Sequence, residues 1–461
     1  MRKMKIFTVF LITVILAALL ALPMASALPA PDVEADAVLL AEMKSGKILW
    51  EYNKDIRVAP GSIAKVMTLL LAVMEVEDGH VDIDDSVTAS ETFLNGLDED
   101  AVKQNIKPGE TLSYRDLLHC AYLASANDAC NILAEEVSGS ARSFVRQMNE
   151  KAEELGCRDT YFMNPGGLKD PGQYTSAWDQ YLIFKEAVEH PLFLEIAGKA
   201  SYVSQGDDDS PERTLVNPNL MLQGESAHYY EYCAAGKTAS SSEYGSSFVS
   251  YADNSELSLI SVVFGVKSAE GDKESNASKC FTETKRLLDW GMTGFAWRDI
   301  VKENEISANE KIEMAKGTDM IGLRPAAPIT VLTRNDLTSE DVIKDIVVYG
   351  QAEGKTISAP VKKGEILGEI IVSIDGAFCG QTQLVAARDV ELDRGAFIKA
   401  QIADTLAIFW VQLVIFLLIA FAAFYIWLVI RDYKLRREKK RRADENRRKM
   451  MEQRRKQTIR K

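Results

Sequence analysis

The chain has 461 residues and a formal net charge of −13 at pH 7. Residues 431–461 carry 16 Lys/Arg against 5 Asp/Glu, so this tail has a net charge of +11. Because the first residues add +3, the long segment between the two ends carries −27. This segment is strongly acidic and has no stripe of basic residues, which excludes nucleic acid as a partner. Its partner should be neutral, cationic or recognised through local contacts.

The N-terminus has the order of a secretory signal peptide. Three basic residues among the first five positions precede an apolar stretch over 6–22, and the small-residue site Ala25-Ser26-Ala27 follows. This order predicts a signal peptide over residues 1–27, cleaved after Ala27. The alternative is an uncleaved membrane anchor. In both cases the body of the protein is exported.

Residues 37–296 contain patterns typical of strands and of helices. The strands at both ends enclose a helical middle, which predicts an α+β domain whose terminal segments pair in one antiparallel sheet. The predicted strands are 37–42, 47–52, 200–204, 232–238, 247–251 and 257–264, and the predicted helices are 66–76, 114–124, 128–137, 141–155, 177–188 and 278–290.

Residues 299–397 change in character to short β-rich runs separated by turns such as Asp375-Gly376. The runs lie at 329–332, 346–349, 369–374 and 383–386. No catalytic constellation is evident there, so this segment reads as a separate small β domain that acts as a spacer.

Residues 406–430 form an apolar stretch of 25 residues in which only Gln412 is clearly polar. A helix of this length spans about 37 Å, enough to cross a membrane, and aromatic residues lie near both ends of the stretch. A buried core helix is the alternative. The basic tail at 431–461 predicts a cytoplasmic C-terminus attracted to anionic lipid, hence a single-pass cell-membrane protein with its body on the extracytoplasmic side.

The cysteines and histidines indicate no metal site. All six cysteines fall in the exported part without a Cys-x-x-Cys pair, so we expect free thiols, although export permits disulfides. The four histidines show no metal-ligand spacing with one another or with cysteine. We therefore expect no metal ion.

Ser62 and Lys65 lie one helical turn apart at the start of the apolar run over 66–76. Residues i and i+3 share a helix face, so the lysine can serve as the base of a nucleophilic serine. This requires a lowered lysine pKa, through burial or a neighbouring cation. The motif alone leaves an alternative open, in which Ser62 caps the helix and Lys65 is solvated.

Two further motifs supply groups of the same kind. Ser125-Ala126-Asn127 lies at the junction of two predicted helices, where the serine can relay a proton and the asparagine can hold an amide. Its alternative role is to cap the helix that begins at Asp128. Gly236-Lys237-Thr238-Ala239 lies on a predicted strand and offers a second cation and a hydroxyl, unless Lys237 is simply exposed.

In this order and spacing the three motifs resemble those of penicillin-binding proteins and serine β-lactamases. The chain is most similar to the low-molecular-mass serine-type D-Ala-D-Ala carboxypeptidases, and the resemblance covers about residues 37–397. It implies the penicillin-binding protein fold, a small all-β C-terminal domain and no cofactor. The segments that carry it, besides the motifs, are 49–53, 59–62, 65–68, 162–168, 217–219, 359–361 and Gly364.

The resemblance implies a set of catalytic roles. Ser62 would attack the carbonyl between two terminal D-alanines, with Lys65 as its base. Ser125 would pass a proton to the departing D-alanine. Asn127 would hold the amide on the acyl side and orient Lys65.

The same resemblance implies the substrate-binding groups and the partners. Lys237 and Thr238 would bind the substrate's free carboxylate, and the backbone N–H groups of Ser62 and Ser240 would hold the oxyanion. The implied substrate is a peptidoglycan pentapeptide ending in D-Ala-D-Ala, whose trimming controls cross-linking in cell-wall biogenesis. β-Lactams would be covalent inhibitors, and membrane lipid would be contacted by the C-terminal helix and tail.

Two positions depart from the family's pattern. Ala239 stands where the third motif usually has glycine, and Gly61 stands where an alanine commonly precedes the nucleophile. A methyl group at Ala239 could hinder the close approach of substrate to the strand or tilt the N–H of Ser240. An alternative is therefore a membrane-tethered penicillin-binding or wall-sensing protein with weak or no turnover. A serine β-lactamase is disfavoured, because no glutamate of the class A type occurs at 161–164.

Overall fold

The computed structural model describes residues 28–99, 101–206, 210–269, 275–351 and 354–458. The predicted signal peptide, residues 1–27, lies outside the described residues. The chain divides into two units. The first contains the described residues up to Arg298 together with Val331–Ser339, and the second contains Asp299–Thr330 and the described residues from Glu340 onward.

The first unit is built on a five-stranded antiparallel sheet. Its strand order β2-β1-β9-β8-β7 places β1, from the start of the unit, beside β9, from near its end. The predicted pairing of the terminal segments in one antiparallel sheet is thereby confirmed. The strands are β1 (Ala37–Glu42), β2 (Ile48–Tyr52), β7 (Cys233–Ser241), β8 (Gly245–Asp253) and β9 (Ser258–Val266).

Strand β1 is buried on both of its faces, since all six of its residues are inaccessible. Ala37, Leu39 and Ala41 point into one hydrophobic core, and Val38 and Leu40 point into another. This split follows from the two-residue period of a strand. The sheet therefore separates two cores, which explains why the first five residues of the strand are all apolar.

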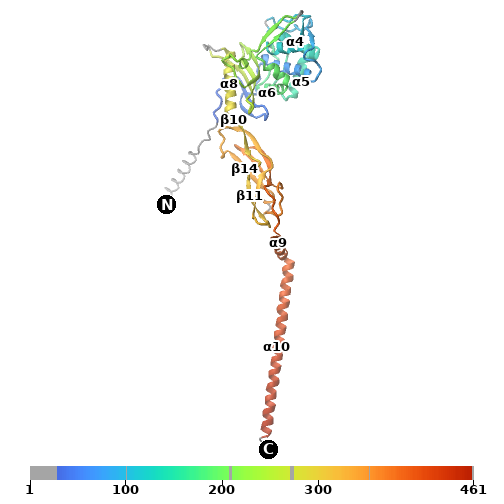
Figure 1. The fold of residues 1–461 in the computed structure, drawn as a ribbon, viewed down its shortest axis with the longest axis vertical. Helices are drawn as coiled ribbons and strands as arrows, with labels where there is room; N and C mark the ends of the chain where they lie inside the picture. Colours follow the sequence, from blue (N-terminus) through green and yellow to red (C-terminus); the bar gives the residue numbers. More distant parts are fainter. Residues whose placement is uncertain (1–27, 100, 207–209, 270–274, 352–353, 459–461) are drawn as a thin grey trace, which may run out of the picture. The chain divides into compact units, whose positions relative to one another are not determined.

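Helices cover both faces of this sheet. The single helix α8 (Asn276–Gly294) packs in the core of one face, and the helical middle of the chain fills the core of the other. Figure 1 shows α8 on one side of the sheet and α4, α5 and α6 on the other. The helices of the second group are α2 (Lys65–Glu77), α3 (Tyr114–Tyr122), α4 (Asn127–Ser138), α5 (Ala141–Glu154), α6 (Ala177–Glu189) and α7 (Pro191–Ala197).

Serine caps define where several of these helices begin. The side chains of Ser113, Ser140 and Ser176 each accept a hydrogen bond from the backbone N–H three residues later, at the starts of α3, α5 and α6. These helices lie close to their predicted bounds. The remaining short elements of the unit are η1 (Gly61–Ala64), β3 (Ser86–Thr88), β4 (Thr111–Ser113), β5 (Ser201–Ser204), β6 (Arg213–Val216) and η2 (Leu220–Leu222).

The second unit contains a six-stranded sheet with the order β14-β16-β17-β12-β11-β15. Strand β16 alternates between buried and half-buried residues, as a strand does when one face lies on a core. The strands are β11 (Ala308–Glu313), β12 (Met320–Pro325), β14 (Val342–Val348), β15 (Ile357–Ser358), β16 (Ile366–Ile374) and β17 (Ala377–Ala386). Strands β10 (Phe295–Val301) and β13 (Ile329–Arg334) form a two-stranded sheet. The predicted α+β class with an added β-rich region is confirmed.

The C-terminal part consists of α9 (Arg394–Ala407) and the long helix α10 (Phe409–Thr458). Ile408, between them, has the extended backbone conformation φ −68°, ψ 123°, which interrupts the helix. The apolar helix therefore begins at Phe409, three residues after the predicted start of the span at 406. Within the described residues, one helix is long and apolar enough to cross a membrane, and its most apolar window has a mean hydropathy of 3.0.

Candidate active site

Ser62 lies in the short helix η1, which leads directly into α2. The residue that caps η1 is Pro60, and no side chain caps the start of either helix. The alternative role of Ser62 as a helix cap is therefore wrong. Its hydroxyl makes no hydrogen bond to any described residue, and it lines a cavity of about 930 Å³. Ser62 is thus placed as a free hydroxyl at the wall of a pocket.

Lys65 is the first residue of α2 and is only 1% exposed. Its Nζ donates to Asn127 Oδ1 at 3.0 Å and to the carbonyl oxygen of Gly166 at 2.5 Å. Burial lowers the pKa of this amine. A neutral amine has two N–H groups and one lone pair, so these two acceptors leave the lone pair free to take a proton. The alternative of a solvated Lys65 is wrong.

Asn127 is the first residue of α4, and its side chain is held at both ends. Its Nδ2 donates to the carbonyl oxygen of Val102 at 3.0 Å, and its own backbone N–H donates to the same oxygen at 2.8 Å. Because the NH₂ group faces a carbonyl, the amide oxygen must face the amine of Lys65. The cap of α4 is Ala126, so neither Ser125 nor Asn127 caps this helix with its side chain.

Lys237, on β7, approaches the same network from the sheet and is 2% exposed. Its Nζ donates to the carbonyl oxygen of Tyr122 at 2.7 Å and to Ser125 Oγ at 3.3 Å, and it lies 5.1 Å from the centre of the Tyr122 ring. Burial, and then the positive charge of Lys65, lowers the pKa of Lys237 to about 7. The alternative of an exposed strand lysine is wrong.

Neither lysine forms a salt bridge with a described carboxylate, and both donate hydrogen bonds to amide, carbonyl or hydroxyl oxygens. Ser125, which lies between Asn127 and Lys237, has a φ of 56°, a value uncommon outside glycine. Such backbone strain is often found at functional sites. Hydrogen bonds thus join Lys65 to Asn127 and Ser125 to Lys237, and the two buried amines approach the nucleophile region from different elements.

Thr238 and Ser240 follow Lys237 along β7, the edge strand of the sheet. Strand β8 pairs with β7 on one side, where Ser240 lies opposite Ser246 with their hydroxyls 3.1 Å apart. Ser240 lines the same cavity as Ser62. Thr238 is half-buried, and no hydrogen bond joins its side chain to the network in the described part of the chain. The structure therefore associates six of the seven predicted residues in pairs: Lys65 with Asn127, Ser125 with Lys237, and Ser62 with Ser240 in the cavity wall. Thr238 lies beside them on the strand.

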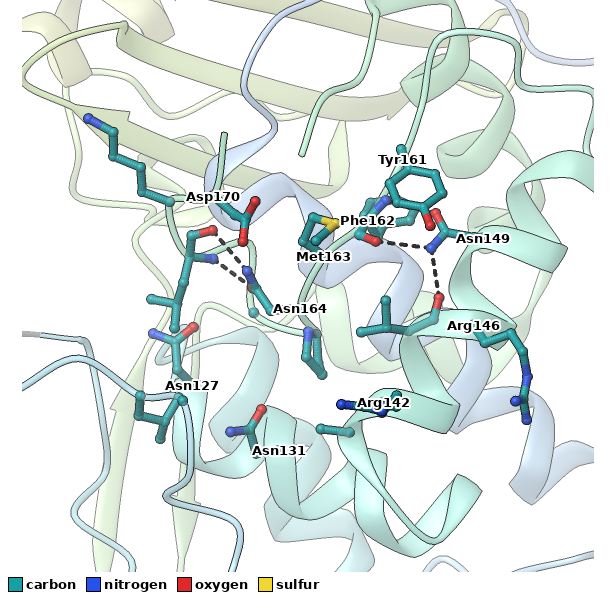
Figure 2. A pocket seen from close by; sticks show the side chains of 18 of the residues that line it. Asn127, Asn131, Arg142, Arg146, Asn149, Tyr161, Phe162, Met163, Asn164 and Asp170 are labelled. Carbon is teal, nitrogen blue, oxygen red and sulfur yellow. Dashed lines mark hydrogen bonds between the residues drawn. The ribbon is translucent and has the colours of Figure 1, made fainter. Parts of the chain in front are cut away.

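A loop over residues 161–170 presents the Gly166 carbonyl to Lys65. Asn149 of α5 fixes the start of this loop, donating from Nδ2 to the carbonyl oxygen of Phe162 and accepting from its N–H at 2.7 Å (Figure 2). Asn164 fixes the middle, exchanging two hydrogen bonds with the backbone of Leu168 (Figure 2). The loop is therefore held by side-chain to backbone bonds on both sides of Gly166.

Asn127 and Gly166 also line a second cavity, of about 960 Å³. Figure 2 shows Asn127 and Asn131 of α4 and Arg142 of α5 along one side of this cavity, and Tyr161 and Met163 of the loop along the other. The two residues that accept hydrogen bonds from Lys65 thus form part of the wall of this cavity.

Glycine is required twice in this loop. A Cβ at Gly166 would overlap the Oδ1 of Asn127, and a Cβ at Gly167, where φ is 74°, would overlap the carbonyl oxygen of Gly61. Both glycines therefore allow the loop to approach the network closely. Sequence reasoning used these glycines only as signs of a resemblance and gave them no role.

The sequence analysis also missed Tyr122 and Val102. Both take part through a backbone carbonyl oxygen, and every residue carries such a group, so no side-chain pattern could single them out. Position alone signals Tyr122, three residues before Ser125 at the end of α3.

In the described part of the chain, no group of three or more His, Cys, Asp or Glu side chains could hold a metal ion. The six cysteines are all free, and four of them are buried.

Comparisons with known proteins identify the family of the chain. Residues 24–268 match the D-alanyl-D-alanine carboxypeptidase family, and residues 295–392 match the C-terminal domain of penicillin-binding protein 5. The chain is 30% identical over 359 residues to the D-alanyl-D-alanine carboxypeptidase DacF of Bacillus subtilis, an alignment that covers 78% of this chain and 86% of DacF. It is 28% identical over 369 residues to DacC of Escherichia coli, with the same coverage.

Solved structures show the same fold. Penicillin-binding protein 5 of Haemophilus influenzae superimposes with a TM-score of 0.57 at 25% identity, covering 79% of this chain and 99% of that one. Penicillin-binding protein 6B of Escherichia coli gives a TM-score of 0.58 at 23% identity, covering 79% and 98%. With the family match extending over more than half of its length, the chain belongs to the D-alanyl-D-alanine carboxypeptidase family.

Proposed function

We propose that this protein is a membrane-anchored serine carboxypeptidase that removes the terminal D-alanine from peptidoglycan stem peptides through an acyl-enzyme on Ser62. The observation that carries the proposal is the pair of buried amines, Lys65 and Lys237, held by neutral oxygens on either side of the Ser125 to Asn127 turn. Burying two lysines without a carboxylate costs stability, and such groups are characteristic of catalytic sites.

Acylation begins with Ser62 Oγ attacking the carbonyl carbon of the penultimate D-alanine. The lone pair of neutral Lys65 takes the hydroxyl proton as the new C–O bond forms. The backbone N–H groups of Ser62 and Ser240 stabilise the negative charge that develops on the carbonyl oxygen. Both residues line the cavity of about 930 Å³, which is where the substrate's reacting end lies in this mechanism.

Breakdown of the tetrahedral intermediate cleaves the C–N bond and releases D-alanine. The departing nitrogen needs a proton, and Ser125 supplies it while the proton that Lys65 took from Ser62 passes to Ser125, so that Lys65 is again neutral. Lys237 donates a hydrogen bond to Ser125 Oγ at 3.3 Å. Lys237 in its charged form, with Thr238, binds the terminal carboxylate of the substrate. Asn127 holds the acyl-side amide and orients Lys65, to which its Oδ1 is already bound. Water then hydrolyses the ester and restores Ser62.

The same serine would be acylated by β-lactams, because their strained amide presents a carbonyl to the same groups. Residues 161–164, where a class A β-lactamase has the glutamate that activates its deacylating water, contain no glutamate here. We therefore expect a long-lived penicilloyl-enzyme rather than rapid penicillin turnover.

The proposed location is the cell membrane. Helix α10 supplies the span, and the strongly basic residues after 430 favour a cytoplasmic C-terminus in contact with anionic lipid. The predicted signal peptide supplies the export of the body. The catalytic unit would then act on the extracytoplasmic face, where cross-linking of the wall is controlled.

D-Alanine release by the full chain in detergent, from a peptide ending in D-Ala-D-Ala, tests the proposal. We expect release by the wild type, covalent labelling by a fluorescent penicillin, and neither with Ser62→Ala. Labelling without D-alanine release would instead support the wall-sensing alternative. Rapid loss of the penicillin label would support a β-lactamase.

A further inference from the structure

Gly61, directly before the nucleophile, faces Ala239, directly before Ser240. A Cβ built on Gly61 would lie 3.2 Å from the Cβ of Ala239, well inside the ordinary contact distance of two methyl groups. The Ala239 methyl packs against the core that contains the helical middle of the chain. The residue is half-buried and also lines the cavity of about 930 Å³, and its methyl group faces η1 at the place where Gly61 has no side chain.

Gly61 is confined on its other side as well. Its carbonyl oxygen lies so close to Gly167 that a Cβ there would overlap it. The start of η1 is thus held between the loop at Gly167 and strand β7 at Ala239. A larger residue at position 61 cannot be accommodated by moving η1 toward the loop, so it must push β7 away.

The two positions lie directly before the two N–H groups that hold the oxyanion in the proposed reaction. Ser62 follows Gly61 on η1, and Ser240 follows Ala239 on β7. The distance between the two elements at this point therefore sets the spacing of those donors. Oxyanion donors act only when they lie at hydrogen-bond distance from the developing charge, so a shift of a few tenths of an ångström affects the rate.

We propose that Gly61 and Ala239 are a coupled positioning pair, in which the absent side chain of one makes room for the methyl group of the other. This inference rests on the proposed function. It assigns to Ala239 a role in setting the spacing between η1 and β7, which is distinct from obstruction of the substrate by its methyl group.

The test is a double-mutant cycle on the full chain in detergent, with wild type, Gly61→Ala, Ala239→Gly and the double variant. The readouts are the rate of acylation by a fluorescent penicillin and the kcat and KM for D-alanine release. We expect Gly61→Ala to slow acylation by about tenfold or more in the wild-type background and by less than about threefold when Ala239→Gly is present. The loss should fall on kcat, with KM changed by less than about twofold, because the donors act on the transition state.

Backbone strain needs a separate control, since Gly61 has a φ of 49° and an alanine there is strained whatever it touches. Gly79→Ala supplies it: Gly79 has a φ of 75°, nothing lies within 4 Å of its added Cβ, and it is remote from the motifs in sequence. This variant should lose some stability and acylate at the wild-type rate. If Gly61→Ala does not fold, Ala239→Val should slow acylation, because it crowds the same contact from the strand.

Equal effects of Gly61→Ala in the two Ala239 backgrounds would overturn the pair, and so would a gain of tenfold or so in acylation from Ala239→Gly alone, which would indicate obstruction. The test of the pair can be distinguished from the test of the proposed function. If the wild type releases no D-alanine, the carboxypeptidase proposal fails. The coupling between Gly61 and Ala239 can still be determined from acylation rates and from the free energy of unfolding of the four variants.

Discussion

The two units of this protein differ in what they bury. The first unit buries charged groups, among them Lys65, Lys237 and Asp128, at exposures of 2% or less. In the described part of the second unit, no polar or charged side chain is buried, and the core consists of residues such as Val372 and Leu384. The second unit thus follows the ordinary rule of apolar residues inside, and the first departs from it.

Buried polar side chains occur throughout the first unit, but the two lysines buried without a carboxylate partner, Lys65 and Lys237, both belong to the network of the three motifs. Burial of an unpaired lysine lowers its pKa and also lowers the folding stability. A buried lysine of this kind has no benefit in a domain whose only role is structural. The contrast therefore locates function in the first unit on physical grounds, independently of any motif. Four predictions test this contrast.

Ser62→Ala should have the largest effect. Removing the hydroxyl removes the atom that forms the covalent bond, so acylation should fall by roughly 10⁴-fold or more. Gel fluorescence after incubation with a labelled penicillin measures it, and mass spectrometry of wild-type peptides locates the adduct. An adduct on another residue would contradict the assignment of the nucleophile.

Gly166→Ala should have the second largest effect on acylation. The new Cβ overlaps Asn127 Oδ1, so the amide must move and Lys65 loses an acceptor. We expect acylation to slow by about a hundredfold, comparable to the loss of a catalytic hydrogen bond. Gly224→Ala is the matched control, because nothing lies within 4 Å of its added Cβ. Similar rates for the two variants would show that the loop does not position Asn127.

Lys237→Met should abolish carboxylate binding and yet stabilise the fold. The unfolded lysine titrates near 10.5 and the folded one at about 7, so the unfolded chain binds more protons between these pH values. Wild-type stability should therefore rise from pH 7 toward pH 10. The variant should gain about 1–4 kcal/mol in free energy of unfolding at pH 7 and little at pH 10. Urea titrations at both pH values measure this, and a gain independent of pH would refute a buried lysine of lowered pKa.

Leu384→Ala should have the smallest effect on activity. The side chain is fully buried in the second unit, so its truncation should cost about 2–5 kcal/mol of stability there. Acylation of Ser62 should change by less than about twofold. Leu69→Ala is the counterpart in α2, the helix that begins at Lys65, and should slow acylation. Equal rates for the two variants would remove the contrast between the units.

Much of the first unit could be predicted from sequence, because its long elements have clear periods. The bounds of α5 and α6 differ from the predicted ranges by one residue. Short elements carry too few residues for a period, and β3 and β4, of three residues each, were missed for that reason. Helix α7 was missed for the same reason.

The site shows a similar division. Side-chain motifs identified Ser62, Lys65 and Lys237, but not the carbonyl oxygens of Gly166 and Tyr122 that hold the two amines. The effect of Ala239 was also beyond sequence reasoning. From the sequence, the methyl group of Ala239 is expected only to hinder the approach of substrate. The fold is needed to show that Gly61 faces this methyl group.

The position of β1 between β2 and β9 has a consequence for how the protein folds. Ala37 pairs with Phe264, over 200 residues later, so the sheet closes only when nearly the whole unit is available. Until then the strand, Ala-Val-Leu-Leu-Ala-Glu, exposes apolar side chains on both faces and is a segment prone to aggregate. The same arrangement that gives the enzyme two cores leaves one edge of its first strand, the edge that β2 does not cover, unpaired until β9 is available.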